Sequence, residues 1–381
     1  MTINLLFTSW YSGVGGGETD LLTQAEALDP QRFRPHLLLP RAGELGEQWA
    51  AHGWPVHYEH WRGASTYFVP QIWARFPVVR RMTTLLKRAN IGLVHADYHT
   101  LPLIQPAAEA AGIPLMWTCH GWWFHPKPWQ RGFFRSLTGA ARSHAIRDGF
   151  LGDPPFMSPE NLPVIYSGID TKRFAPGDGR EVILAEAGVP AGSPIVAMVA
   201  RFQEVKGHHH FLAMAKLVLQ THPGTHFLIA GENAFGVAKD ATYRQRILDT
   251  IAADAQLSQH VHLLGFRTDV EHVLQAADVV VCPSDFESYG KVNLEAMACA
   301  VPVVSTNRGG PAEIVRDGET GYLVNPANTS EMATAISKLL ADKGLRQWIG
   351  QQARAYVQAN FSIDIMAKQY ELIFQRLLKD V

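Results

Sequence analysis

Residues 278–304 read DVVVCPSDFESYGKVNLEAMACAVPVV: an apolar run, a polar loop, a helix-period segment and a second apolar run. Short runs that are apolar throughout are typical of strands buried on both faces, and a helix between two such strands makes them parallel. The stretch therefore predicts one strand–helix–strand unit. The stretch also places two glutamates, Glu287 and Glu295, near the amino-terminal end of a helix that we expect to begin near Ser288 or Tyr289.

The same alternation of apolar runs and helix-period segments extends over the whole chain and predicts an α/β protein with doubly wound parallel sheets. A chain of 381 residues is longer than a domain with a single hydrophobic core usually is, so we expect two domains. Glycines and prolines in residues 166–179 mark the linker. The predicted division is an N-terminal domain in residues 1–168, a C-terminal domain in 169–360, and a helix in 361–381 that can fold back onto the first domain. Strands are predicted at residues 3–8, 35–40, 55–59, 91–96, 114–119, 194–200, 226–231, 261–266, 278–284, 301–306 and 321–324.

The composition excludes several classes of protein. Apolar residues make up 47% and charged residues 18% of the chain, which is typical of a globular protein, and the net charge of -1 argues against a nucleic-acid partner. The three cysteines lie in apolar runs without metal-like spacing, which indicates free thiols in a reducing compartment. We see no signal peptide and no membrane-spanning run, and we therefore expect a cytoplasmic protein.

The candidate site lies in loops that follow predicted strands, where open parallel sheets bind ligands. The free amides at the start of the helix after Glu287 favour an anion, and Gly290 lets a phosphate approach the backbone. Glu295 can accept paired hydrogen bonds from a ribose diol, and Glu287 can accept them from a second sugar. Arg201 and Lys206 share one loop and suit a diphosphate. Taken singly, such glutamates more often cap helices or form salt bridges, and such basic residues are usually solvated.

Residues 283–324 (PSDFESYGKVNLEAMACAVPVVSTNRGGPAEIVRDGETGYLV) resemble the signature region of the retaining glycosyltransferases of family 4. The likeness also includes GVGGGE (13–18), CHG (119–121), YSGIDTKRF (166–174), ARFQEVKG (200–207) and LLGFRTDVEHVLQAADVVV (263–281). The resemblance implies the GT-B fold, in which two Rossmann-like domains face each other across a cleft. It also implies an enzyme that moves a sugar from a nucleotide-diphosphate sugar to a hydroxyl acceptor.

The resemblance assigns roles to individual residues. Glu295 would hold the donor ribose, Glu287 the hydroxyls of the donor sugar, and Arg201 and Lys206 the diphosphate. His120 would lie near the reacting sugar. The remaining matched positions are the backbone segment Tyr289, Gly290, Lys291 and Val292 around sugar and phosphate, the loop glycines Gly16 and Gly17, and Phe266 and Arg267 beside the base.

This chain departs from the family pattern at a few positions. Relatives often read EGFG or EPFG at 287–290, where this chain has ESYG, and they often read PNG at 166–168, where it has YSG. They usually carry glycine at position 300, which is alanine here. These differences weaken any inference about the sugar that is transferred. We favour a UDP-sugar over a GDP-sugar because UDP is more frequent in the family.

The chemistry implied by the resemblance needs no enzyme base, because the departing phosphate takes the acceptor proton. The chain contains no D-x-D motif, so we predict a metal-independent transferase without a cofactor other than the nucleotide sugar. Residues 208–210 are three consecutive histidines at a predicted helix start, where side chains diverge, and a metal site is not expected there. A sugar-nucleotide epimerase or hydrolase on the same scaffold, or an inactive nucleotide-sugar- or carbohydrate-binding protein, remains an alternative. Glycoside hydrolysis by Glu287 and Glu295 is disfavoured because the two acids do not flank one bond.

The acceptor is predicted from the first half of the chain, where basic side chains outnumber acidic ones between residues 60 and 150. Segment 71–90 pairs an apolar helix stripe with arginines, and segment 117–135 interleaves aromatic and basic residues. Such surfaces suit docking at an anionic membrane, here the inner face, and a glycolipid or lipid-linked acceptor. Two alternatives stay open: the apolar stripe is core and the arginines are solvated, or the aromatics stack on a soluble sugar.

Overall fold

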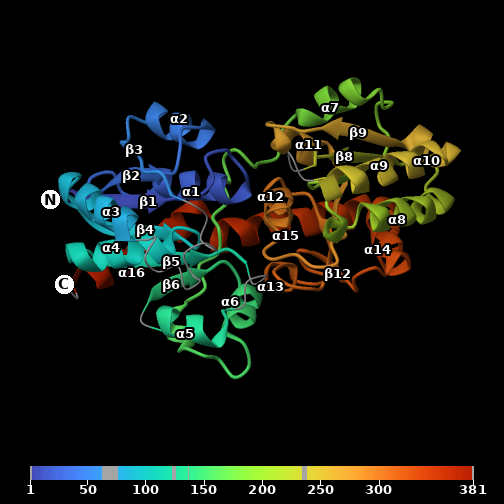
Figure 1. Cartoon of the computed structure of the whole chain (residues 1–381). Helices are drawn as coiled ribbons and strands as arrows, with labels where there is room; N and C mark the ends of the chain where they lie inside the picture. The colour runs from blue at the N-terminus through green and yellow to red at the C-terminus, as the bar shows by residue number, and fades with distance from the viewer. Residues whose placement is uncertain (1, 62–75, 122–125, 136, 234–237, 380–381) are drawn as a thin grey trace. The chain divides into compact units, whose positions relative to one another are not determined.

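The computed structural model describes residues 2–61, 76–121, 126–135, 137–233 and 238–379 (Figure 1). Contacts divide the chain into two units, Met1–Gly168 together with Ile363–Val381, and Ile169–Ser362. Each unit contains a six-stranded sheet in which every pair of strands is parallel, and helices cover both faces of each sheet. This architecture confirms the predicted fold class of doubly wound α/β units.

The sheet of the first unit has the strand order β3-β2-β1-β4-β5-β6. From β1 the chain winds outward to β2 and β3, and from β4 it winds in the opposite direction to β5 and β6. The adjacent pair β1 and β4 is therefore the switch point of this sheet. The strands are β1 (Ile3–Thr8), β2 (Phe33–Leu39), β3 (Val56–Tyr58), β4 (Ile91–Asp97), β5 (Leu115–Cys119) and β6 (Thr138–Ala141).

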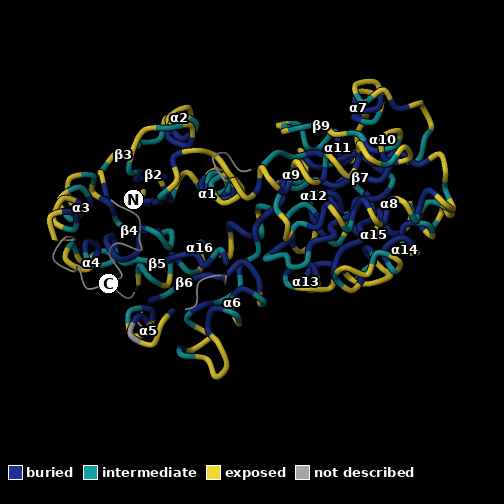
Figure 2. The backbone as a smooth tube through the Cα atoms, turned by 45° about the vertical axis from the view of Figure 1, so that its right-hand side comes forward, coloured by how far each residue is buried: buried dark blue, intermediate teal, exposed yellow. Residues whose placement is uncertain are grey.

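Two apolar cores cover the faces of this sheet, and Figure 2 shows the buried strands between more exposed helices. Met82 and Leu86 fill the core on the side of α3 and α4. Tyr370 and Phe374 of α16 are fully buried in the other core, so the last helix belongs to the first sheet. The helices are α1 (Gly16–Ala27), α2 (Glu44–Ala51), α3 (Phe76–Arg88), α4 (Leu101–Ala111), α5 (Pro128–Phe134), α6 (His144–Leu151), the 3₁₀ turn η3 (Pro159–Asn161) and α16 (Ile363–Lys379).

The second unit repeats this arrangement with the order β12-β11-β10-β7-β8-β9, and its switch point lies between β7 and β10. Its strands are β7 (Ile195–Val199), β8 (His226–Ala230), β9 (Val261–Gly265), β10 (Val279–Cys282), β11 (Val303–Thr306) and β12 (Gly321–Val324). Its helices are α7 (Gly179–Ala187), α8 (His208–Thr221), α9 (Ala238–Ala252), α10 (Ala255–His260), α11 (Val270–Ala276), α12 (Lys291–Ala298), α13 (Pro311–Ile314), α14 (Thr329–Ala341), α15 (Lys343–Asn360) and the 3₁₀ turn η4 (Glu204–Lys206).

Two features differ from the sequence prediction. Strand β6 was not predicted, because Thr-Gly-Ala-Ala has little strand propensity. A Cβ on Gly139 would lie 2.6 Å from Nε1 of Trp117, so the glycine makes room for a buried indole. Helix α12 begins at Lys291 and not near Ser288 or Tyr289, because Gly290 has a φ of +83° and its left-handed backbone lies outside the helix.

The carboxyl end of α12 contains a strained alanine. Ala300 has a φ of +59°, and it occupies the position where members of the family that the sequence resembles usually carry glycine. The amide of Val301 donates to the carbonyl of Ala296, and the amide of Ala300 donates to Met297, both at 3.0 Å. These two bonds form a Schellman ending, which requires the left-handed conformation at position 300.

We predict that Ala300→Gly stabilises the second unit by about 1 kcal/mol, since it removes the cost of a left-handed Cβ, and raises its melting temperature by roughly 2–4 °C. The matched control is Ala298→Gly, inside the same helix, which should destabilise by about 1 kcal/mol. Thermal unfolding followed by circular dichroism measures both. A lower melting temperature for Ala300→Gly would contradict this account of the helix end.

Candidate functional site

The loops that follow β7 and β10 meet at the switch point of the second unit. The amide of Asp285 donates to the carbonyl of Val205 at 2.9 Å, which joins the two backbones. Gly207 has a φ of +74°, and a Cβ on it would lie 2.1 Å from the carbonyl oxygen of Pro283. Glycine at position 207 therefore permits the contact between the loops.

An ion pair between Lys206 and Glu287 joins these loops a second time. Nζ of Lys206 lies 2.5 Å from Oε2 of Glu287, and the two side chains are 22% and 13% exposed. The hydroxyl of Ser284 donates to the same carboxylate oxygen at 3.5 Å. A charge pair this far removed from water is stronger than a surface pair, although its desolvation opposes part of the gain. The structure thus brings two of the predicted site residues together.

The backbone around Glu287 rests on a pair of glycines in the loop after β11. The amide of Gly310 donates to the carbonyl of Glu287 at 2.9 Å. A Cβ on Gly309, whose φ is +79°, would lie 2.1 Å from that carbonyl oxygen, and one on Gly310 would lie 2.4 Å from Cα of Tyr289. The glycines of the GGP motif therefore shape the Glu287 loop, a role that the sequence analysis did not assign.

Helix α12 presents its first turn beside this loop. Gly290 is its N-cap, Lys291 and Val292 form its first turn, and no side chain of the described residues caps its amides. A Cβ on Gly290 would approach the side chains of Asn293 and Glu287 to 2.9 Å and 3.3 Å. Uncapped amides with the helix dipole behind them favour an anion.

Glu295 lies in the second turn of α12 and is half-buried. Burial raises the pKa of its carboxyl group, and the nearby charges of Lys291 and Arg173 partly oppose this shift. Arg173 does not pair with Glu295, because its guanidinium donates to Glu271 at 2.8 Å and to the carbonyl of Thr268 at 2.6 Å. Within the described chain Glu295 has no ion-pair partner of its own, so its carboxylate is available as a hydrogen-bond acceptor.

Three other predicted residues of this unit lie in different surroundings. Arg201 is exposed and forms no ion pair with any residue that the structure describes, so it does not share the contact of Lys206 with Glu287. Phe266 is 75% exposed in the loop after β9. The guanidinium of Arg267 is bound by Asp269, at 2.7 and 2.8 Å, and by Glu186. Arg267 therefore holds its loop against α7, and its side chain is not free to meet a ligand.

His120 lies after β5 in the first unit, next to a buried ion pair. Arg142, which follows β6, forms an ion pair with Asp20 of α1. Arg142 is 3% exposed and Asp20 is 4% exposed. Burial and then the charge of Arg142 lower the pKa of His120 to about 4. The hollow beside it, also lined by His95 and Asp97, measures about 10 Å³ and admits at most about one water. At neutral pH His120 is an uncharged imidazole.

Gly16 and Gly17 are the first residues of α1 and are exposed. Apart from the chain neighbours and the backbone of the same helix, a Cβ added to either would have no atom of the described residues within 4 Å. The side chain of Glu18 accepts a hydrogen bond from the amide of Gly15 at 3.2 Å, which closes the preceding turn. Packing within this unit therefore does not require glycine at positions 16 and 17.

The two segments predicted to dock on a membrane are described only in part, since residues 71–75 and 122–125 lie outside the described ranges. Val78, Met82 and Leu86 of α3 face the core, and so does Phe134. The arginines of α3, Arg80, Arg81 and Arg88, are exposed and line a hollow of about 800 Å³ with His57 and Glu59. None of the helices in the described ranges combines the length and apolar character that a membrane crossing requires.

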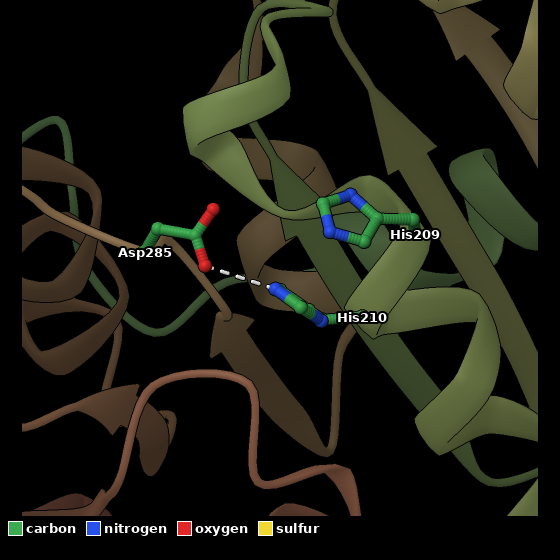
Figure 3. A group of neighbouring side chains, drawn as sticks. All are labelled: His209, His210 and Asp285. Atoms are coloured by element: carbon green, nitrogen blue, oxygen red, sulfur yellow. Dashed lines mark hydrogen bonds and ion pairs between the residues drawn. The ribbon is translucent and has the colours of Figure 1, made fainter.

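The three consecutive histidines do begin a helix, α8, but only one of them diverges from the others. His208 is buried and stacks on Phe202, with ring centroids 4.3 Å apart. The rings of His209 and His210 lie 3.9 Å apart and approach Asp285 (Figure 3). The expectation that all three side chains point in different directions is therefore wrong for His209 and His210.

Both halves of the chain match known protein families. Residues 14–173 match the family described as Glycosyltransferase Family 4, and residues 179–356 match Glycosyl transferases group 1. An alpha-maltose-1-phosphate synthase of Mycolicibacterium smegmatis is 34% identical over 62% of this chain and 62% of its own length. A D-inositol 3-phosphate glycosyltransferase of Nocardia farcinica is 35% identical over 53% of this chain and 45% of its own length. The match thus spans about half to three fifths of these curated relatives.

Solved structures share the fold over the whole chain. A glycosyltransferase from Rickettsia africae superposes with a TM-score of 0.88 at 20% identity and full coverage of both chains. HepE of Anabaena in complex with UDP superposes with a TM-score of 0.81 at 23% identity, over 99% of this chain and 100% of that one. At these identities the likeness establishes the fold alone.

We predict that the imidazole of His120 titrates with a midpoint near pH 4 in the folded protein. Because this pKa lies below the value of about 6.5 for an unfolded histidine, the group favours folding fully above pH 6.5, and this contribution is lost as the pH falls toward 4. Side-chain ¹⁵N NMR across pH 7 to 3.5 measures the midpoint, and loss of the signal in His120→Gln assigns it. A midpoint at 6 or above would refute the neutral assignment.

Proposed function

The chain belongs to the family 4 (group 1) glycosyltransferases of GT-B fold, and on that premise we propose that it transfers a sugar from a nucleoside diphosphate sugar to a hydroxyl acceptor with retention of configuration. In this reaction the bond between the anomeric carbon and the diphosphate oxygen breaks. The acceptor oxygen bonds to the same carbon from the departing side. The proton of the acceptor passes to the departing phosphate, so atoms and charge balance without an enzyme base.

The observation that carries the proposal is the cation beside uncapped amides at the switch point of the second unit. The departing diphosphate gains negative charge in the transition state, and fixed positive groups lower that barrier. The first turn of α12 supplies such groups, and so does Lys206, because its ammonium has three N–H donors and gives only one of them to Glu287. Arg201 has no protein partner among the described residues and can turn toward the same anion. This set supports transfer without a metal.

The two glutamates suit different parts of the donor. Glu295 has no ion-pair partner among the described residues, so its carboxylate can accept two hydrogen bonds from a ribose diol. Glu287 is neutralised by Lys206, which suits an acceptor for sugar hydroxyls better than a nucleophile or base. That pairing also disfavours the epimerase and hydrolase alternatives, which need a general base.

The donor that we propose is a UDP-sugar. HepE, which has the same fold, has been solved with UDP, with UDP and glucose, and with UDP-glucose. These complexes are properties of HepE and support UDP ahead of GDP for this chain. His120, uncharged at neutral pH, suits a hydrogen bond to the sugar and not stabilisation by its own charge.

The proposal predicts that UDP raises the melting temperature, and that UDP-sugars yield a glycosylated product in the presence of EDTA. Glu295→Gln should weaken UDP binding at least tenfold, equivalent to about 1.4 kcal/mol, because it removes an anionic acceptor for the ribose. Glu287→Gln should lower turnover with a smaller effect on UDP affinity. Calorimetric titration and a product assay by mass spectrometry measure these effects.

Glu181→Gln serves as the matched control, since Glu181 is an exposed glutamate in the first turn of another helix of the same unit. Its UDP affinity and turnover should equal those of the wild type. Equal UDP affinity in wild type and Glu295→Gln would remove the ribose role. Binding of nucleotide sugars without product for any acceptor tested would favour the inactive binding protein instead.

We further propose a glycolipid or lipid-linked acceptor, presented at an anionic membrane face. The support is electrostatic: Arg80 and Arg88 are exposed beside a hollow of about 800 Å³, and neither is bound to an acid of the described residues. Arg81, by contrast, is paired with Glu59 at 2.9 Å. The guanidinium groups of Arg80 and Arg88 could therefore bind an anionic head group or a diphosphate.

Flotation with vesicles of phosphatidylcholine and phosphatidylglycerol tests the membrane proposal. We expect binding at low salt that weakens as salt rises, and severalfold weaker binding for Arg80→Gln/Arg88→Gln, because the attraction is between exposed charges. Lys172→Gln/Lys343→Gln removes the same charge elsewhere and should float like the wild type. Absence of flotation at low salt would rule out the membrane and leave a soluble acceptor.

A further inference from the structure

The start of α8 and the loop after β10 bring three metal-binding side chains together outside the predicted donor contacts. One ligand atom each from His209, His210 and Asp285 lies within 4.8 Å of the other two, and Figure 3 shows the side chains around a common space. Nε2 of His210 is 2.9 Å from Oδ1 of Asp285. We propose that these three residues form a binding site for a divalent transition-metal ion of the zinc class.

The spacing and chemistry of the three groups suit such an ion. Tetrahedral Zn²⁺ with bonds of about 2.0–2.1 Å holds its ligand atoms about 3.3 Å apart. The pair His210–Asp285 already has nearly this spacing, and the ligand atom of His209 lies within 4.8 Å of both. Two imidazoles and one carboxylate are a donor set that Zn²⁺ accepts in proteins, with a remaining position for water.

The surroundings of His209 resemble the outer shell of a metal ligand. Its Nδ1 lies 2.9 Å from the hydroxyl of Tyr243, and its backbone amide donates to the same hydroxyl at 3.3 Å. A hydrogen bond at Nδ1 fixes the ring and leaves Nε2 to face the ion.

An ion at this position would connect the two loops that also carry Lys206 and Glu287. The histidines follow η4 on the β7 side, and Asp285 lies two residues before Glu287 on the β10 side. Metal binding would therefore add a third link beside the ion pair and the backbone bond. This inference does not depend on the proposed transferase activity, and the ion is not required to touch the donor.

Calorimetric titration of the full, untagged chain with Zn²⁺ tests the site, and Co²⁺ absorption reports whether imidazole nitrogen is bound. We expect one ion per chain, displaced by EDTA. His209→Ala and Asp285→Asn should each weaken Zn²⁺ binding at least tenfold, and His209→Ala/His210→Ala should abolish it. Melting temperatures in EDTA check that each variant is folded.

The matched control is His260→Ala/His262→Ala, which alters the other histidine cluster of the same unit, where Nδ1 of His226 lies 2.9 Å from Nε2 of His262. Its Zn²⁺ affinity should equal that of the wild type. Unchanged Zn²⁺ binding in folded His209→Ala/His210→Ala, loss of binding in the control variant, or no stoichiometric binding to the wild type would each overturn the proposal. UDP binding is measured separately, so the two proposals fail independently.

Discussion

A sheet of parallel strands that winds outward in both directions from two adjacent strands leaves the loops after those two strands side by side, with no crossing helix between them. In the first unit the strands are β1 and β4, and the hydroxyl of Thr8 donates to Asp97 at 3.3 Å across the switch point. In the second unit they are β7 and β10, and Lys206 meets Glu287 there. In both units, polar side chains contact each other in the loops or strand ends at the switch point of the sheet.

In the second unit, glycines and a charge pair determine how the loops at the switch point pack. Gly207, Gly309 and Gly310 occupy positions where a Cβ would lie within 2.4 Å of neighbouring backbone, so the loops pack without side chains between them. The close approach leaves the side chains of Lys206 and Glu287 only 22% and 13% exposed, which strengthens their attraction. Burial acts differently on unpaired groups, since it raises the pKa of Glu295 and lowers that of His120. The second unit thus contains an acid neutralised by Lys206 and an acid without an ion-pair partner among the described residues, and the first unit contains a neutral imidazole.

The sequence predicts the fold well because buried parallel strands are continuous apolar runs, and the doubly wound class and the family resemblance are confirmed. The prediction misses β6, where Gly139 makes room for the indole of Trp117 and the sequence has little strand propensity. Residue types at the site were predictable, but their partners were not. Lys206 pairs with Glu287, and Arg267 pairs with Glu186, through contacts between segments that are 81 residues apart in the sequence. His209 and His210 converge for the same reason.

The central claim is that the diphosphate of a nucleotide sugar binds at the start of α12, beside Lys206, with its ribose on Glu295. A crystal structure of the protein soaked with UDP tests this claim most directly. The account predicts phosphate oxygens within hydrogen-bond distance of the amides of the first turn and of Nζ of Lys206, and both ribose hydroxyls on the Glu295 carboxylate. UDP bound at another position, or its ribose turned away from Glu295, would contradict it.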